Sequence, residues 1–111
     1  MSGLDLKWSG SEKKVARRAF DLAFDAAFAK LMAEFKSRAD AVAEPADLWE
    51  MERYLRRQRR ELEELFDFRY SQLPLVFARL IREEYLDERH LAGLSDAKLE
   101  IVRSYLSLPK G

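Results

Sequence analysis

Apolar residues recur every three or four positions between Ser9 and Ala43. This spacing is typical of an amphipathic α-helix, in which one apolar stripe is turned toward other apolar surface. The stripe comprises Val15, Phe20, Phe24, Phe28, Leu31, Met32, Phe35, Ala39 and Val42. Ser9 and Glu12 have the spacing of a capping box, which satisfies two free amides at a helix start. The pattern therefore predicts a long first helix over about 11–43.

A second long helix is predicted to begin at Pro45. Proline ends the preceding helix, and its fixed φ suits the first turn of the next one. Asp47 complements the positive end of the helix dipole there. A seam of apolar residues follows, with three leucines spaced by seven. The seam comprises Leu48, Met51, Leu55, Leu62 and Leu65. We expect this helix to reach about Phe68.

The third predicted helix is shorter and apolar on nearly all sides. Ser71 is placed to cap it, and Pro74 falls in its first turn, where a missing amide donor costs little. Its apolar residues are Leu73, Leu75, Val76, Phe77, Leu80 and Ile81. Because polar residues are nearly absent from this run, we expect it to be the most buried element.

Two short elements are predicted in the last 25 residues. A helical turn over 87–91 should be ended by Gly93. Ser95 or Asp96 can then cap a final helix that runs to about Leu106. The whole chain, 1–111, is expected to form a single helical domain, with its ends at 1–8 and 107–111 frayed.

The length of the first helix indicates a partner. A helix over 11–43 would be about 45 to 50 Å long, whereas a globule of this size is only about 35 Å across. Phe20, Phe24, Phe28 and Phe35 cannot all be covered by the short carboxyl-terminal helices, and large exposed apolar stripes are rare on monomers. We expect an all-α homodimer, in which two long helices form an antiparallel hairpin beside a short carboxyl-terminal helical head. The predicted dimer interface comprises Leu48, Met51, Leu55 and Leu62. The alternative is a kinked first helix folded into a monomeric bundle.

Composition excludes several classes of protein. Hydrophobic residues make up 48% of the chain, which is too apolar for a disordered protein. The 20 basic and 20 acidic residues cancel, which disfavours general binding to nucleic acid or to anionic membranes. The absence of cysteine excludes disulfides and thiol chemistry. Neither a signal peptide nor an apolar run of roughly 20 residues is present, so we expect a cytoplasmic protein without a membrane span.

No catalytic motif is recognisable in the sequence. It contains no glycine-rich phosphate loop, paired histidines or Ser/His/Asp arrangement. Asp87 and His90 are three residues apart, near Glu83 and Glu84, and could form half of a carboxylate metal site. One histidine cannot supply the other half, and a solvated turn is the simpler interpretation. We therefore expect no enzyme activity, no metal and no cofactor.

An arginine cluster at Arg56, Arg57, Arg59 and Arg60 has two interpretations. Taken alone it suggests a phosphate-binding patch. Glutamates four residues away allow these charges to pair along one helix instead. The possible pairs are Glu52 with Arg56, Arg57 with Glu61, Arg59 with Glu63, and Arg60 with Glu64. A solvated, self-paired face is the simpler interpretation, and a partner surface that uses one or two of these arginines is the alternative.

Trp49 lies about 100° round the second helix from the seam that contains Leu48. It could therefore pack in a dimer contact, or remain exposed as a contact for another protein. Tryptophan is enriched in binding hot spots because a large rigid ring gains contact area at little entropic cost. Both interpretations stay open from the sequence.

One ordered set of residues resembles the fluorescence recovery protein family of cyanobacteria. The similarity extends from Trp8 to Leu106 with almost no gaps. It comprises W-S-x-x-E at 8–12, Phe20, D-L-W at 47–49, Arg59, Glu61, Asp67, Arg69, Ser71, the run 75–80, Leu91, Leu94, Asp96 and Ile101. The resemblance implies an all-helical dimer. It also implies binding to the carboxyl-terminal domain of light-activated orange carotenoid protein, faster return of that protein to its resting form, and its release from the antenna.

The resemblance also implies a partner-binding surface. The family positions fall on Leu48, Trp49, Glu52, Arg53, Arg59 and Leu75. Trp49 and Arg59 keep the family residue. The family pattern has a histidine in place of Glu52, an aspartate in place of Arg53 and an aromatic residue in place of Leu75. A charge reversal at a contact can cost several kcal/mol. The alternative function is therefore a helical dimer that binds a different protein client in a bacterium without orange carotenoid protein.

Overall fold

A computed structural model describes residues 7–109. Its elements are α1 (Gly10–Asp40), α2 (Pro45–Leu65), α3 (Leu73–Arg82), the 3₁₀ helix η1 (Glu88–Leu91) and α4 (Asp96–Leu106). Within the described part all regular elements are helical, which confirms the all-α prediction. Of the ends that were expected to fray, residues 1–6 and 110–111 lie outside the described residues.

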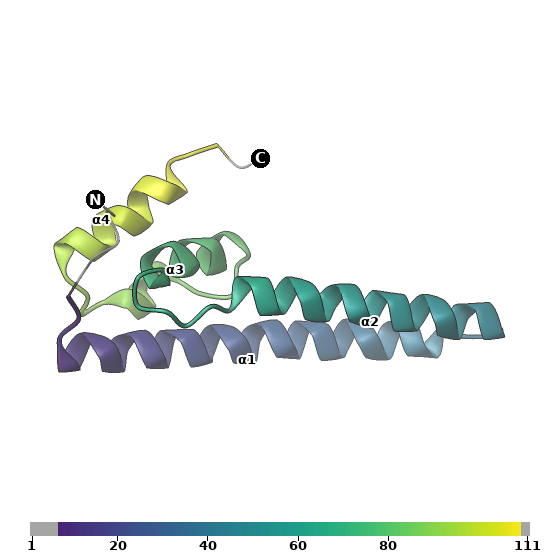
Figure 1. The fold of residues 1–111 in the computed structure, drawn as a ribbon. Coiled ribbons are helices and arrows are strands. Elements are labelled where there is room, and N and C mark those ends of the chain that lie inside the picture. Colours follow the sequence, from purple (N-terminus) through teal and green to yellow (C-terminus); the bar gives the residue numbers. More distant parts are fainter. Residues whose placement is uncertain (1–6, 110–111) are drawn as a thin grey trace.

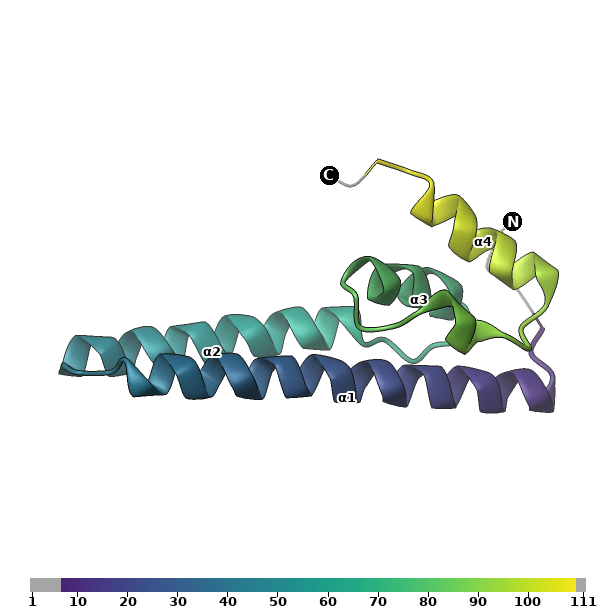
Figure 2. The ribbon, with the colours of Figure 1, turned by 180° about the vertical axis from the view of Figure 1, so that it is seen from behind.

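The molecule is elongated rather than spherical. α1 and α2 lie side by side and run in opposite directions, and we call them together the arm (Figure 1). α3, η1 and α4 gather over the amino-terminal half of α1, and we call them the head (Figures 1 and 2). The radius of gyration is 16.9 Å and the extents are 53 × 26 × 21 Å, whereas a compact chain of this length has a radius near 13 Å. Much of the arm therefore extends beyond the head.

The core lies between the head and the first half of α1. α3 contributes most of it, as the sequence predicts, and the largest fully buried side chains are Phe77, Leu73, Leu80, Leu91, Val102 and Pro74. α1 meets this core with a row of buried alanines, Ala16, Ala19, Ala23 and Ala27, together with Phe20. Small side chains allow a close approach of the helix, so the phenylalanines after Phe20 face elsewhere.

The start of α1 is connected to the start of α4 by a buried ion pair. Ser9 and Glu12 form the predicted capping box, and the Glu12 carboxylate also accepts from the backbone N–H of Ser95 at 2.8 Å and from Lys98 Nζ at 3.1 Å. Lys98 Nζ donates further to the carbonyl of Lys7 at 2.6 Å. Hydrogen bonds from the Ser9 and Ser95 amides, together with Lys98, lower the pKa of Glu12 to about 2 despite its burial.

The connection between α1 and α2 is longer than the sequence predicts. α1 ends at Asp40, so the prediction that it reaches Ala43 is wrong by three residues. Glu44 is extended, with φ −129° and ψ 159°, as steric crowding before proline favours. The Asp47 carboxylate accepts hydrogen bonds from the Ala43 and Glu44 amides, both at 3.0 Å, and these lower its pKa. Pro45 begins α2 as predicted.

The end of α2 also differs from the prediction. The helix ends at Leu65 rather than near Phe68, because Phe66 and Phe68 leave the helical path and pack edge-on against Phe20, with ring centroids 5.3 and 4.9 Å away. Gln72, not Ser71, is the residue before α3. It makes no side-chain capping bond, so the predicted serine cap is wrong, while Pro74 lies in the first turn as expected.

The turn around η1 is held by local hydrogen bonds. Asp87 Oδ1 accepts from the Arg89 amide at 2.9 Å, and the Asp87 amide donates to His90 Nδ1 at 3.1 Å. Gly93 follows with φ +106°, where a Cβ would lie 3.0 Å from Val15 Cγ2. Glycine is required there by both the left-handed backbone and the close approach to α1. Asp87 thus begins this turn and Gly93 ends it, as predicted, and Ser95 caps α4.

Candidate protein-binding surface

An apolar groove lies between the two long helices. Phe24 and Phe28 of α1 are 42% and 45% exposed. They line a groove of about 410 Å³, which we call the aromatic groove. Its lining residues are Phe24, Phe28, Leu31, Leu55, Arg59, Leu62, Glu63 and Phe66. Clustered exposed apolar residues of this kind are typical of surfaces that bind another protein.

The floor of the aromatic groove is continuous with the core. Phe24 contacts Phe28 at a centroid distance of 5.5 Å and meets Phe66 edge-on at 5.4 Å. Phe66 in turn packs against Phe20, which is nearly fully buried. Edge-to-face pairs of this kind stabilise by about 0.5 to 1.5 kcal/mol beyond area burial. The rings are therefore held in place before any partner arrives, which lowers the entropic cost of binding.

The predicted dimer seam is divided between two places. Leu55 and Leu62 line the aromatic groove. Met51 lines a separate hollow of about 200 Å³ near the connection between the long helices. Leu48 lies in the first turn of α2 and is exposed. A single chain therefore leaves much of the seam accessible.

Trp49 projects from the first turn of α2 and is 62% exposed, more than any other large hydrophobic side chain over residues 7–109. Its neighbour Leu48 is exposed as well. Trp49 is therefore not buried within the single chain, and both interpretations from the sequence, a dimer contact and a contact for another protein, remain possible. An exposed indole beside an exposed leucine forms an apolar surface, and covering it with a partner is favourable.

The charged residues of the predicted partner surface pair within α2. Glu52 accepts from Arg56 at 2.8 Å, Arg53 donates to Glu50 at 3.0 Å, and Arg59 donates to Glu63 at 3.3 Å. Two of the four predicted pairs, Glu52 with Arg56 and Arg59 with Glu63, are thus confirmed. Over residues 7–109 the other two, Arg57 with Glu61 and Arg60 with Glu64, are not formed. All these side chains are largely exposed, so each pair contributes only about 0.5 kcal/mol.

The six predicted partner residues do not form one patch in a single chain. Leu75 is half-buried on α3, and α3 lies beside the far end of α2 from Trp49 (Figure 1). The helical rise from Trp49 to the end of α2 is about 24 Å. A partner that touches both Trp49 and Leu75 must therefore span much of the molecule, or contact two chains of an assembly.

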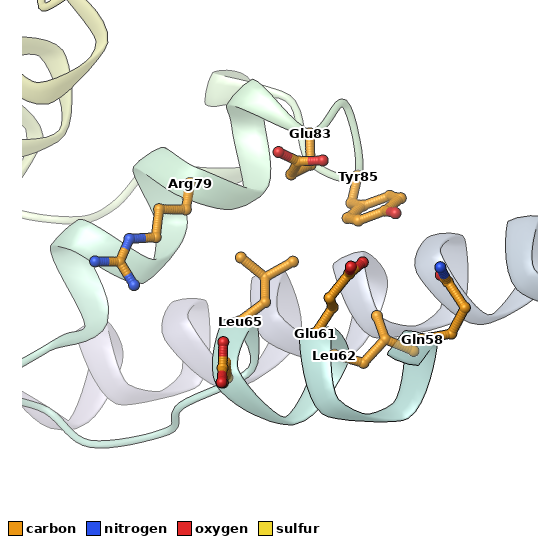
Figure 3. A pocket seen from close by; sticks show the side chains of 8 residues that line it. Gln58, Glu61, Leu62, Leu65, Arg79, Glu83 and Tyr85 are labelled. Carbon is orange, nitrogen blue, oxygen red and sulfur yellow. The ribbon is translucent and has the colours of Figure 1, made fainter. Parts of the chain in front are cut away.

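A more polar hollow of about 340 Å³ separates α2 from α3. Glu61 and Gln58 rise from α2 toward Tyr85, while Arg79 extends along α3 away from Glu83 (Figure 3). The residues that line it include no nucleophile paired with a base. In the described part of the chain, no group of three or more histidine, cysteine or acidic residues is arranged to hold a metal ion, and no helix is long and apolar enough to cross a membrane.

Several lining residues of the aromatic groove were not among the predicted interface residues. Phe24, Phe28 and Leu31 belong to the predicted stripe of α1, and their spacing was the available signal. Phe66 was predicted to lie inside α2, and no local signal in the sequence indicates that it turns toward Phe20 and Phe24. The groove therefore combines a periodic pattern with one residue that tertiary packing places.

The chain is similar to fluorescence recovery proteins over nearly its whole length. The family model for the photoprotection regulator fluorescence recovery protein matches residues 8–106. The fluorescence recovery protein of Synechocystis sp. PCC 6803 is 27% identical over 101 residues, which covers 91% of this chain and 93% of that protein. A solved structure from Fremyella diplosiphon is 34% identical, covers 91% of this chain and 98% of its own, and superposes with a TM-score of 0.84. A solved Synechocystis structure is 26% identical over 92% of this chain and all of its own, with a TM-score of 0.86.

Proposed function

The chain belongs to the fluorescence recovery protein family, and from this premise we propose that it binds the carboxyl-terminal domain of photoactivated orange carotenoid protein. Binding accelerates the return of that protein to its resting orange form and so restores antenna fluorescence. The chain would act as a catalyst of a conformational change, because it would bind a state on the return path more tightly than the activated state.

The exposure of Trp49 is the observation that carries this proposal. The indole of Trp49 is 62% exposed to water, which is unfavourable for a large apolar ring. Binding of a partner that covers the ring is therefore favourable. Trp49 also keeps the family residue, as does Arg59 on the same helix. Together they give the partner an apolar ring and a guanidinium, both of which are common in binding hot spots.

The test is the dark recovery of photoactivated orange carotenoid protein, followed by absorbance. We expect the wild-type chain to accelerate recovery. Trp49→Ala should reduce that acceleration at least about tenfold, because truncation of a binding hot spot costs about 1.4 kcal/mol or more. Leu108→Ala is the matched control, because Leu108 is 57% exposed and lies beyond α4. Equal acceleration by wild type and Trp49→Ala would contradict the role of the ring.

We further propose that the chain forms a homodimer through the aromatic groove and the seam of Leu48, Met51, Leu55 and Leu62. The support is the amount of apolar surface that the groove leaves open. A two-fold axis would set the groove of one copy against that of the other. Arg59 and Glu63 have opposite charges at its rim, so such an axis also permits attraction between copies.

Light scattering after gel filtration tests the dimer over a wide range of concentrations. We expect twice the 13.0 kDa chain mass for the wild type and a single chain mass for Leu55→Glu/Leu62→Glu, because two carboxylates would be buried in an apolar contact. Leu22→Glu, on the opposite face of α1, should leave the mass doubled. A wild type that stays monomeric at every concentration would refute the dimer.

The second candidate function is a helical dimer that binds another protein client. Arg53 favours it, because this side chain is positive where the family pattern is negative. Its ion pair with Glu50 at 3.0 Å offsets that charge only in part. The two functions are separated by Glu52→His/Arg53→Asp, which restores the family pattern. Recovery that is accelerated by this variant but not by the wild type would favour the other client.

A further inference from the structure

A second groove lies on α1, on the side away from the aromatic groove, and it is lined by cations. Its lining residues are Val15, Arg18 and Leu22 from α1, with Arg89, His90 and Ala92 from η1 and the residue after it. The volume is about 420 Å³. None of the lining residues has a carboxylate. We call this the basic groove.

The basic groove has an apolar floor and fixed walls. Leu22 is 41% exposed, and Val15 packs against the core. The η1 segment is seated directly on α1, because Gly93 lies so close that a Cβ there would be 3.0 Å from Val15 (Figure 2). Asp87 caps this turn through the Arg89 amide at 2.9 Å. The two arginines are therefore presented from well-ordered elements rather than from a loose loop.

The guanidinium groups of this groove are available to a partner. Over residues 7–109 no carboxylate lies within ion-pair distance of Arg18, and Arg89 is 80% exposed with its nearest carboxylate, Asp87, at 4.0 Å. Lys14 adds a third cation one turn before Arg18. The neighbouring carboxylates are Asp21 and Asp25 on α1 and Asp87 and Glu88 at η1, of which Asp21 pairs with Arg17 and Glu88 with Arg103. The lining itself therefore has two arginines and no carboxylate, although the whole chain has no net charge.

The two grooves can be occupied at the same time. Leu22 and Phe24 are two residues apart, which places them about 200° apart around α1. The aromatic groove is formed with α2, whereas the basic groove is formed with η1. A second copy of the chain that covers the phenylalanines would therefore leave Arg18 and Arg89 open to solvent.

We propose that the basic groove docks an acidic segment of a partner protein, with an apolar side chain on Leu22 and carboxylates on Arg18 and Arg89. Arginine binds carboxylates with directed, often bidentate hydrogen bonds. The exposed leucine in the same groove as the arginines suits a peptide better than a nucleic acid backbone, which presents no aliphatic side chain. This surface is additional to the one around Trp49 and does not depend on which client that surface binds.

The probe is a fluorescein-labelled helical peptide with leucines four residues apart, flanked by glutamates. A second peptide has lysine in place of every glutamate. Fluorescence anisotropy should show that the wild type binds the acidic peptide and not the basic one, and that added salt weakens binding. Arg18→Glu/Arg89→Glu should weaken binding by about tenfold or more, because two attractive charges become repulsive.

The control is Arg57→Glu/Arg60→Glu, which makes the same change in net charge on α2 and should alter affinity less than about twofold. Circular dichroism checks that both variants stay helical. Equal weakening in the two variants would overturn the proposal, as would no binding of the acidic peptide at roughly 1 mM. Peptide-induced NMR shifts at Phe24 and Phe28 rather than at Leu22 and Ala92 would overturn it too. The proposal would also be overturned if single-stranded DNA or phosphatidylglycerol vesicles bound in a way that depends on Arg18 while the peptide did not bind.

Discussion

The head and the arm are stabilised in different ways. In the head, α3 buries six of its ten residues, and Phe77, Leu80 and Val102 are fully enclosed. In the arm, α2 is more than twice as long, yet Tyr54 is its one buried residue. Much of the apolar surface of the arm, including Phe24 and Phe28, remains in contact with water.

The difference separates folding from binding. A side chain that is already buried in the single chain contributes to the stability of that chain, whereas an exposed apolar side chain can contribute only when another molecule covers it. The head thus supplies a folded base. The arm holds the aromatic groove and the exposed indole of Trp49 away from that base, where a partner can reach them.

The largest effect on stability is expected when a buried phenylalanine is replaced, and the comparison is with an exposed one. Phe77→Ala removes a fully buried ring, and we expect a loss of about 3 to 5 kcal/mol in the free energy of unfolding at every protein concentration. Phe28→Ala removes a ring that is 45% exposed, so the loss should be under about 1 kcal/mol in dilute solution. Urea denaturation followed by circular dichroism measures both. An equal loss for the two variants in dilute solution would show that the arm is packed within the single chain.

The second prediction concerns the ion pair between the two regions. The pKa of Glu12 is lowered from 4.5 to about 2, so its carboxylate stabilises the fold above pH 4.5, and this contribution is lost as the pH falls toward 2. The shift corresponds to at most about 3 to 4 kcal/mol. The stability difference between the wild type and Glu12→Gln should therefore be largest above pH 5 and shrink toward pH 2.

Two further variants sharpen this test. Glu83→Gln alters an exposed carboxylate of the head and should show no such difference between pH 5 and 2. Glu12→Gln/Lys98→Met removes both members of the pair, so it should be more stable than Glu12→Gln alone, which leaves a buried ammonium without its counter-ion. A difference from the wild type that stays constant with pH would show that Glu12 acts through packing alone.

The smallest effect is expected inside the arm. Tyr54 donates its hydroxyl to Glu34 at 3.2 Å, and Arg38 lies over its ring at 3.9 Å. Burial and the Glu34 carboxylate raise the pKa of this phenol. Tyr54→Phe keeps the ring and should cost about 1 kcal/mol, measured by hydrogen exchange of the α2 amides. Tyr70→Phe, at a partly exposed ring, should leave α2 exchange unchanged; if it does not, the hydroxyl of Tyr54 is not the cause.

Elements marked by local chemistry could be predicted. The Ser9 and Glu12 capping box, Pro45, Gly93 and the Ser95 cap each act through neighbours in the sequence, and the structure has all of them. Boundaries set by distant residues could not. α2 ends at Leu65 because Phe66 and Phe68 pack on Phe20, some 45 residues earlier in the chain, and nothing close to them in the sequence indicates that contact.

The candidate site shows the same division. The phenylalanine stripe indicated that apolar surface would remain uncovered, and the position of Trp49 relative to the seam indicated that it need not be buried with Leu48. The sequence alone did not place Leu75 far from Trp49. That separation follows from the length of α2 and the packing of α3 beside its far end.

The sequence by itself determined which segments are helical, the caps at Ser9 and Ser95, and the family, because these depend on periodicity, on contacts within one turn and on an ordered set of residues. Only the tertiary structure decided which apolar residues are enclosed. The alanine row of α1 and Phe20, rather than Phe24 and Phe28, face the core because small side chains let α3 and η1 approach closely. The same approach turns Phe24 and Phe28 outward and places Arg89 beside Arg18, so both grooves arise from packing between elements that are distant in the sequence.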